Sequence, residues 1–172
     1  MKVSELMTRQ VATVRAGDSA STAARLMWDG DCGALPVLDD DGRPRAMVTD
    51  RDLSMTAMFQ DRPMSAILVS EAMSKSLASC GPDDNVIDAE RTMRRNQLRR
   101  LPVMDSEGRL VGILALADIV RATGRDNGKP SGRGSRRSET IPDEVAATLA
   151  DICSPRQPSA AQDGKARAGN AR

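Results

Sequence analysis

Two short elements of this sequence carry polar side chains at a spacing suited to binding a phosphorylated sugar. In the first element, Thr49 precedes Asp52 by three residues at the start of an expected helix. The carboxylate can accept both hydroxyls of a ribose, while the threonine hydroxyl and the free N–H groups of the helix start can face a phosphate. The same spacing also defines a capping box, in which the two side chains satisfy only their own backbone. The motif alone leaves both interpretations open.

The second element is less well equipped for the same chemistry. It keeps a carboxylate, Asp118, but has Ala115 where the first element has Thr49. Two arginines, Arg99 and Arg100, precede it and could hold a phosphate with their forked, permanently charged donors. Arginines at the end of a helix are also simply favourable to its dipole, so their role stays open at this point.

The two elements belong to a duplication. Residues 3–56 align without a gap on residues 69–122 at a constant offset of 66, with 16 identities in 54 positions. A unit of that length buries only a modest fraction of its surface alone, so two copies are expected to pack on each other and share a core. A ligand is then expected between them.

Each copy is predicted to fold in the order β-α-β-β-α, an α/β pattern with small sheets covered by helices. The first helix of each copy is expected to begin at an aspartate N-cap, Asp18 or Asp84. A hairpin with an acidic turn ending in glycine follows the second strand. The expected strands are 11–14, 35–37 and 45–48, then 77–80, 101–103 and 110–114, and the closing helices run from 49 to about 59 and from 115 to about 123.

The remaining chain is divided by composition. The first repeat is assigned to residues 1–60, the connection to 61–68 and the second repeat to 69–123. Residues 124–140 are basic and poor in apolar side chains, which predicts disorder. Apolar residues at helical spacing predict a short helix over 141–153, and 154–172 is expected to be a disordered tail.

Composition disfavours several classes of protein. The chain has no histidine, and its three cysteines (Cys32, Cys80 and Cys153) are scattered, so neither a metal site nor an enzyme is expected. A charge balance of 25 basic and 24 acidic residues and an aromatic content of 1% make nucleic acid an unlikely partner. No segment has the features of a membrane span or a signal peptide, so a cytoplasmic location is expected.

These motifs resemble those of the tandem CBS domain pair, also called the Bateman module. The resemblance covers residues 3–122 and rests on the repeated opening Val-Ser-Glu-x-Met, the repeated Leu-Pro-Val strand and the element from Ala46 to Asp52. That element is similar to the family's ribose-phosphate signature, Gly-hydrophobic-x-Ser/Thr-x-x-Asp, with Ala46 in the glycine position. The resemblance implies two repeats packed with pseudo-twofold symmetry, a non-enzymatic regulatory role, and a homodimer.

The resemblance also implies a ligand and its contacts. It implies an adenine nucleotide (AMP, ADP or ATP) as a regulatory ligand, with no cofactor or metal, bound where the signature of one repeat faces the other repeat. The main site would comprise Met47, Thr49, Asp52, Ala78, Arg99 and Arg100. A degenerate second site would comprise Ala12, Cys32, Gly33, Ile113, Ala115 and Asp118.

Alternatives remain open from the sequence. S-adenosylmethionine, NAD or a cyclic dinucleotide could replace the adenine nucleotide, because the signature defines the ribose and phosphate more clearly than the rest of the ligand. The module could instead be a scaffold that works without nucleotide and whose basic segment 121–137 contacts a protein or nucleic-acid partner. A catalytic role would have to use one of the cysteines or an isolated carboxylate, and none has a recognisable activating neighbour.

Overall fold

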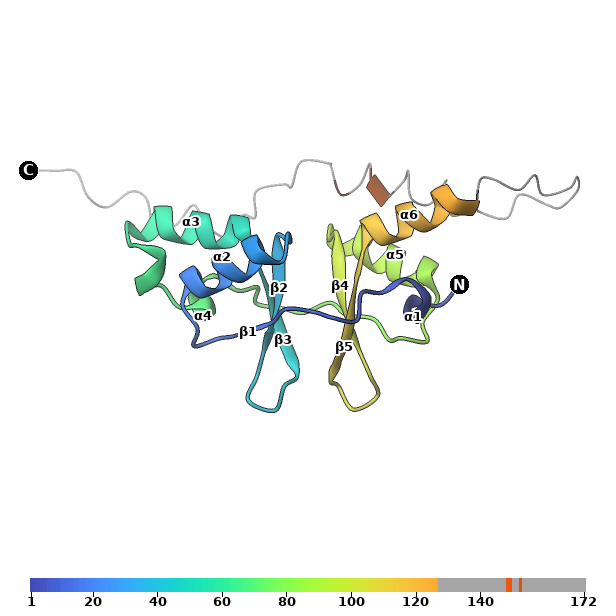
Figure 1. The fold of residues 1–172 in the computed structure, drawn as a ribbon, viewed down its shortest axis with the longest axis horizontal. Coiled ribbons are helices and arrows are strands. Elements are labelled where there is room, and N and C mark those ends of the chain that lie inside the picture. The colour runs from blue at the N-terminus through green and yellow to red at the C-terminus, as the bar shows by residue number, and fades with distance from the viewer. Residues whose placement is uncertain (127–147, 150–151, 153–172) are drawn as a thin grey trace, which may run out of the picture.

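The computed structural model describes residues 1–126, Thr148, Leu149 and Ile152 (Figure 1). The first repeat contains α1 (Val3–Leu6), β1 (Val14–Arg15), α2 (Ala20–Asp29), β2 (Ala34–Leu38), β3 (Pro44–Thr49) and α3 (Asp50–Gln60), and a 3-10 turn at Met64–Ala66 follows. The second contains α4 (Val69–Ala72), α5 (Val86–Asn96), β4 (Arg100–Met104), β5 (Leu110–Ala115) and α6 (Leu116–Asp126). The predicted α/β class is confirmed, and the order α-β-β-α is duplicated. The predicted first strands are mostly wrong: of 11–14 only Val14 lies in a strand, β1, and the second repeat has no named strand before α5.

Each repeat builds its sheet around one β-hairpin. In the first repeat, β1 lies parallel to β2, and β2 pairs antiparallel with β3. In the second repeat, β4 pairs antiparallel with β5. The helices α2, α3, α5 and α6 lie toward one side of the molecule, and both hairpin turns extend toward the other (Figure 1). Buried residues of the strands, such as Val37 and Val103, face these helices and form the cores.

The predicted strand at 77–80 is wrong except at its last residue. Cys80 makes a single parallel bridge with Val103, at the position that corresponds to the pair of Val14 with Val37 in the first repeat. Earlier in this segment, Ser74 is hydrogen-bonded to Met47 in the other repeat. The segment between Ser74 and Cys80 therefore crosses from one core to the other.

The expected helix caps are displaced by one residue. Ser19 accepts a hydrogen bond from Thr22 N–H and caps α2, and Asn85 accepts one from Ile87 N–H and caps α5. Asp18 instead accepts from Arg15 N–H at 2.7 Å, and Asp84 accepts from Gly81 N–H at 2.7 Å. The aspartates thus close the turns that precede the helices, since a short acidic side chain bonds equally well to turn N–H groups.

The opening helices of the repeats are exchanged between the two cores. Val3 N–H in α1 donates to the carbonyl of Asp84 at 3.0 Å, and Val69 N–H in α4 donates to the carbonyl of Asp18 at 2.8 Å. Val3 and Val69 are 66 residues apart, and so are Asp18 and Asp84, so the two hydrogen bonds are equivalent in the two halves. Val3 is buried in the second repeat's core and Val69 in the first repeat's core. This reciprocity confirms the predicted pseudo-twofold packing.

The chain beyond Thr123 was expected to be linker, short helix and tail. Helix α6 continues to Asp126, three residues beyond the boundary placed after Thr123. Thr148, Leu149 and Ile152 are helical; Thr148 is fully buried, and Ile152 packs against the second repeat's core. The other residues of 127–172 lie outside the described residues, so the division of the tail stays a prediction.

Candidate functional site

Thr49 and Asp52 form a capping box at the start of α3. Asp52 N–H donates to Thr49 Oγ1 at 3.1 Å, and the carboxylate oxygen Oδ2 of Asp52 accepts both the hydroxyl of Thr49 at 2.7 Å and its N–H at 3.2 Å. All of these bonds to the carboxylate use Oδ2. The other oxygen, Oδ1, accepts no hydrogen bond from the described residues. The capping interpretation is therefore correct, and it uses only one oxygen of this half-buried carboxylate.

The second signature is closed within its own helix. Ala115 N–H donates to Asp118 Oδ2 at 2.8 Å, which reproduces the backbone part of the first capping box. No hydroxyl is present at Ala115. The other oxygen of Asp118, Oδ1, pairs with the guanidinium of Arg121 one turn later in α6. Both oxygens of Asp118 are thus engaged, in contrast with Asp52.

Met47 and Ile113 lie where the repeats are joined. Met47 N–H donates to Ser74 Oγ at 3.0 Å, and Ser74 N–H donates to the Met47 carbonyl at 2.8 Å. The equivalent pair in the other half is Thr8 and Ile113, which exchange two backbone hydrogen bonds of 2.9 Å. Each signature strand therefore carries the opening segment of the other repeat just before its Thr49 or Ala115 position.

The glycine of the signature has a packing role at this junction. A Cβ atom added to Gly112 would lie 2.7 Å from Met7 Sδ and 2.9 Å from the Thr8 carbonyl oxygen. The incoming segment can reach β5 only because Gly112 has no side chain. The first repeat has the buried Ala46 at this position, so glycine is not needed there.

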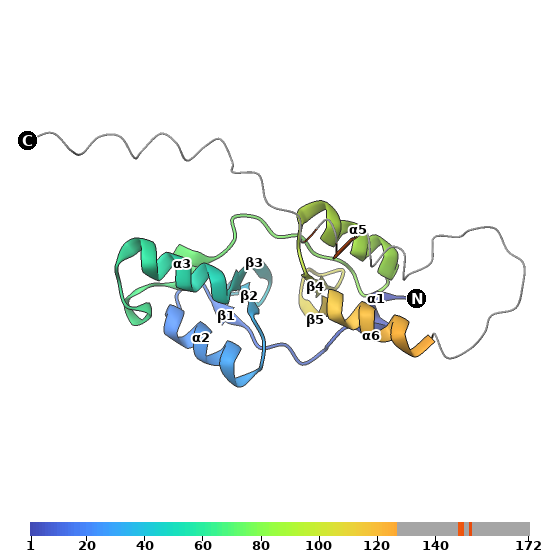
Figure 2. The same ribbon diagram turned by 90° about the horizontal axis from the view of Figure 1, so that it is seen from above.

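Arg99 and Arg100 are held by the backbone of their own repeat. Arg100 pairs with Ala115 in the β4–β5 hairpin, and the carbonyl of Arg99 accepts from Leu116 N–H at 2.8 Å. In the described part of the chain, neither arginine makes a hydrogen bond or ion pair with Thr49 or Asp52. The two hairpins stand next to each other in both views (Figures 1 and 2). Grouping these arginines with the first signature stays a prediction.

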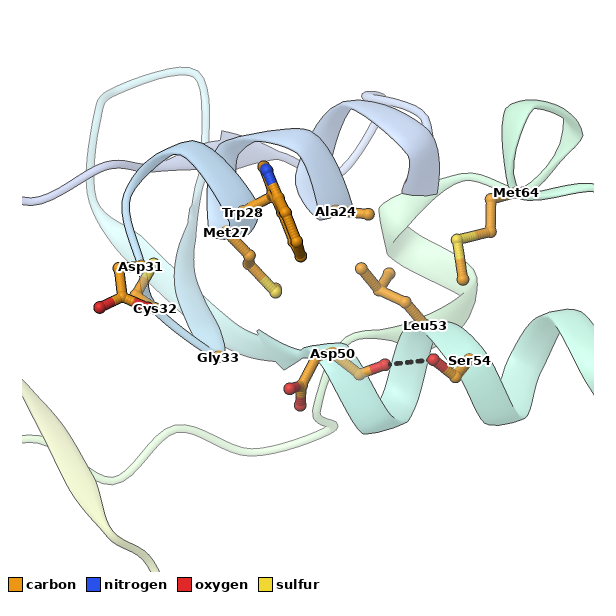
Figure 3. A pocket seen from close by; sticks show the side chains of 10 residues that line it. All are labelled: Ala24, Met27, Trp28, Asp31, Cys32, Gly33, Asp50, Leu53, Ser54 and Met64. Carbon is orange, nitrogen blue, oxygen red and sulfur yellow. Dashed lines mark hydrogen bonds between the residues drawn. The ribbon is translucent and has the colours of Figure 1, made fainter.

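The remaining predicted site residues lie in different environments. Ala78 is half-buried against the second repeat's core, and Ala12 is exposed. Cys32 and Gly33 line a groove of about 370 Å³ between α2 and α3, together with Trp28 and Asp50 (Figure 3). This groove belongs to the first repeat alone, and the sequence reasoning missed it. Trp28, at 86% exposure on an otherwise amphipathic helix, was the available signal.

Cys80 is a buried thiol of low reactivity. Burial raises the pKa of the Cys80 thiol to about 12, and the nearby charge of Asp84 adds to the effect. The thiol is therefore protonated near neutral pH and unreactive. Cys32 is a half-buried free thiol, and Cys153 lies outside the described residues. Within residues 1–126 and the three described tail residues, no cluster of three or more Cys, Asp or Glu could hold a metal ion.

Over the same residues, no helix is long and apolar enough to cross a membrane. The functional features described so far are therefore two helix starts, each with a carboxylate, at the junction of two interlocked α/β repeats. The fold therefore defines a class of protein: a tandem pair of interlocked α/β repeats, each with an Asp-containing signature at the start of its last helix.

Comparison with known proteins gives the family. The family model of the CBS domain matches residues 3–56 and again residues 69–125, so the chain belongs to the CBS domain family and contains two CBS domains. The CBS domain-containing protein YhcV of Bacillus subtilis is 41% identical over 117 residues, which cover 68% of this chain and 81% of YhcV. The resemblance predicted from the sequence is confirmed.

Two solved structures are similar to this chain in both fold and sequence. CBSX2, from Arabidopsis thaliana, in complex with AMP has a TM-score of 0.64 and 28% identity, and the match covers 73% of this chain and 98% of CBSX2. Hypoxic Response Protein I with two coordinated zinc ions has a TM-score of 0.64 and 29% identity, covering 70% and 98%. The corresponding protein of Mycobacterium tuberculosis is 32% identical over 117 residues.

Proposed function

We propose that this protein is a non-enzymatic regulatory module that binds an adenine nucleotide, AMP, ADP or ATP, at the junction of its two CBS domains. The observation that carries the proposal is the free Oδ1 of Asp52. It lies at the N-terminus of the eleven-residue helix α3, beside a threonine hydroxyl. A ribose hydroxyl can donate to this oxygen without breaking the capping box, and the helix start favours a phosphate.

The similarity to CBSX2, which was solved with AMP, supports the same ligand class. YhcV, of which the match covers 81%, is named for its CBS domains alone, which supports a module without a catalytic domain. The high pKa of Cys80 adds to this view, because it removes one of the few candidate nucleophiles.

Binding would be transmitted through the junction of the repeats. Met47 precedes Thr49 by two residues and holds Ser74 of the second repeat by two hydrogen bonds. A ligand that moves the start of α3 therefore acts directly on a segment of the other repeat, and the population of repeat orientations shifts. We propose a homodimer and a separate protein partner as the receivers of this change.

The test is calorimetric titration of the full-length protein with AMP, ADP, ATP and S-adenosylmethionine. Asp52→Ala should abolish measurable binding, because it removes the ribose acceptor. Asp118→Ala is the matched control from the second repeat and should have a small effect, since its carboxylate is already paired with Arg121. Equal losses in both variants would contradict the asymmetric site. Absence of binding by the unmodified protein would overturn the proposal and favour the scaffold alternative with its basic segment 121–137.

A further inference from the structure

We propose that Arg121 competes with a ribose for the carboxylate of the second signature, and that the residue at this helix position biases ribose binding toward the first of the two pseudo-symmetric sites. The inference rests on the proposed function and deepens it. It concerns two equivalent positions, Met55 in α3 and Arg121 in α6, which are related by the repeat offset of 66. Each lies three residues after the carboxylate of its own signature.

The contacts of Asp118 show how the second signature is closed. Its side chain is only 11% exposed, with Oδ2 held by Ala115 N–H and Oδ1 held by the guanidinium of Arg121. A ribose hydroxyl is a donor to a carboxylate, as is a guanidinium, so the two compete for Oδ1. A ribose hydroxyl must therefore share Oδ1 with Arg121 or displace it.

The first signature lacks this competitor. Met55 has a thioether, which donates no hydrogen bond, so Oδ1 of Asp52 remains available. The helix frames are otherwise alike: Leu53 and Ile119, at equivalent positions, are both almost fully buried and fix the rotation of α3 and α6 in the same way. The helix starts also differ in charge, because Asp50 and Arg51 have Leu116 and Ala117 as their counterparts. Among the groups that contact the carboxylates, the differences are Thr49 against Ala115 and Met55 against Arg121.

The strength of the closure follows from the exposure of the arginine. The Arg121 side chain is 69% exposed, so its ion pair is screened by water and can be displaced. Exposed pairs of this kind change an equilibrium by about two- to five-fold at moderate salt. Arg121 thus acts as a weak internal competitor, and the missing hydroxyl at Ala115 adds a separate loss of the same order.

The first test places the arginine in the site that works. Met55→Arg should weaken AMP binding by about two- to five-fold, whereas Met55→Leu, a control that donates no hydrogen bond, should stay near the unmodified protein. Raising the salt concentration should reduce the difference between the two variants, because salt screens the added ion pair. Thermal melting of both variants reports whether α3 still packs. Unchanged AMP affinity in a folded Met55→Arg protein would overturn the inference.

The second test opens the other site in an Asp52→Ala background, in which the first site is disabled. The Asp52→Ala protein should bind no measurable AMP, so the readout is the recovery of binding: Ala115→Thr combined with Arg121→Met should restore measurable binding, and tighter binding than Ala115→Thr alone by about two- to five-fold. Equal or tighter binding with Arg121 kept would mean that the arginine does not compete for Asp118 and would overturn the inference, as would no binding by the combined variant. A failure of the proposed function itself is distinguishable, because the unmodified protein would then bind no nucleotide.

Discussion

Ser74 Oγ accepts a hydrogen bond from Met47 N–H at 3.0 Å, and this contact ties the opening of the second repeat to the signature strand of the first. Its counterpart in the other half joins Thr8 to Ile113. Each core contains the opening helix of the other repeat, so neither half has a complete core of its own. The repeats are therefore expected to unfold as one cooperative unit.

Gly112 tests the importance of this junction. Gly112→Ala places a methyl group within 3 Å of Met7 and the Thr8 carbonyl, so it should lower the free energy of unfolding by about 1–3 kcal/mol. Urea denaturation provides the measurement. Gly17→Ala is the matched control, because a Cβ atom at Gly17 meets no atom within 4 Å. A similar loss in both variants would mean that the close approach at Gly112 has no special cost.

Two substitutions near the C-terminus test whether Ile152 packs on the second repeat's core in solution. Ile152 packs against the second repeat's core, so Ile152→Ala should lower the free energy of unfolding by about 1–2 kcal/mol, less than for a fully buried isoleucine. Leu149 is 42% exposed, and Leu149→Ala should change stability by less than about 0.5 kcal/mol. Equal effects on the denaturation midpoint would show that Ile152 is not held on the core in solution.

The free energy of unfolding should fall in acid because two carboxylates in the hairpin turns become protonated. The carboxylates of Asp39 and Asp105 accept backbone N–H groups, from Arg43 and Arg109 first of all, and this lowers the pKa of both below the ordinary value of 3.8. Since the folded pKa is lower than the unfolded one, the contribution is present above pH 3.8 and is lost as the pH falls through the folded pKa.

Denaturation at a series of pH values below 5 measures this contribution. The double variant Asp39→Asn with Asp105→Asn should show a shallower loss of stability over that range than the unmodified protein. An identical pH dependence in the two proteins would assign the acid sensitivity to other groups.

The thiols should differ in reactivity. With a pKa of about 12, Cys80 is about one part in ten thousand thiolate at pH 8, so alkylation should be very slow in the folded protein. Cys32 is partly exposed and should react faster. Peptide mapping after timed iodoacetamide treatment separates the two sites. Rapid modification of Cys80 without denaturant would contradict its burial.

Trp28 reports on the proposed homodimer. It is the single tryptophan of the chain and is 86% exposed on α2, and Phe59 is 77% exposed on the neighbouring α3. If copies associate through this helical face, acrylamide quenching of Trp28 should decrease as protein concentration rises and the sedimentation coefficient increases. A dimer with unchanged quenching would place the interface elsewhere.

The sequence by itself determined the parts of this protein that depend on short-range patterns. The offset of 66 and the helical spacing of apolar residues predicted two α/β repeats, and the spacing of Thr49 and Asp52 gave the capping box as one of two interpretations. These features involve residues a few positions apart, for which geometry follows from the period of a helix or a hairpin. The three-residue spacing of Asp118 and Arg121 was equally readable but was not recognised.

Only the tertiary structure decided which segments meet. The exchange of α1 and α4 depends on bonds such as Val3 N–H to the Asp84 carbonyl, and backbone groups are the same in every residue. The sequence therefore gives no signal for their choice of partner. For the same reason, Arg99 was predicted from side-chain chemistry, whereas its hydrogen bond to Leu116 follows from the register of the β4–β5 hairpin. Side-chain patterns specify the elements, and long-range backbone pairing specifies how the elements are joined.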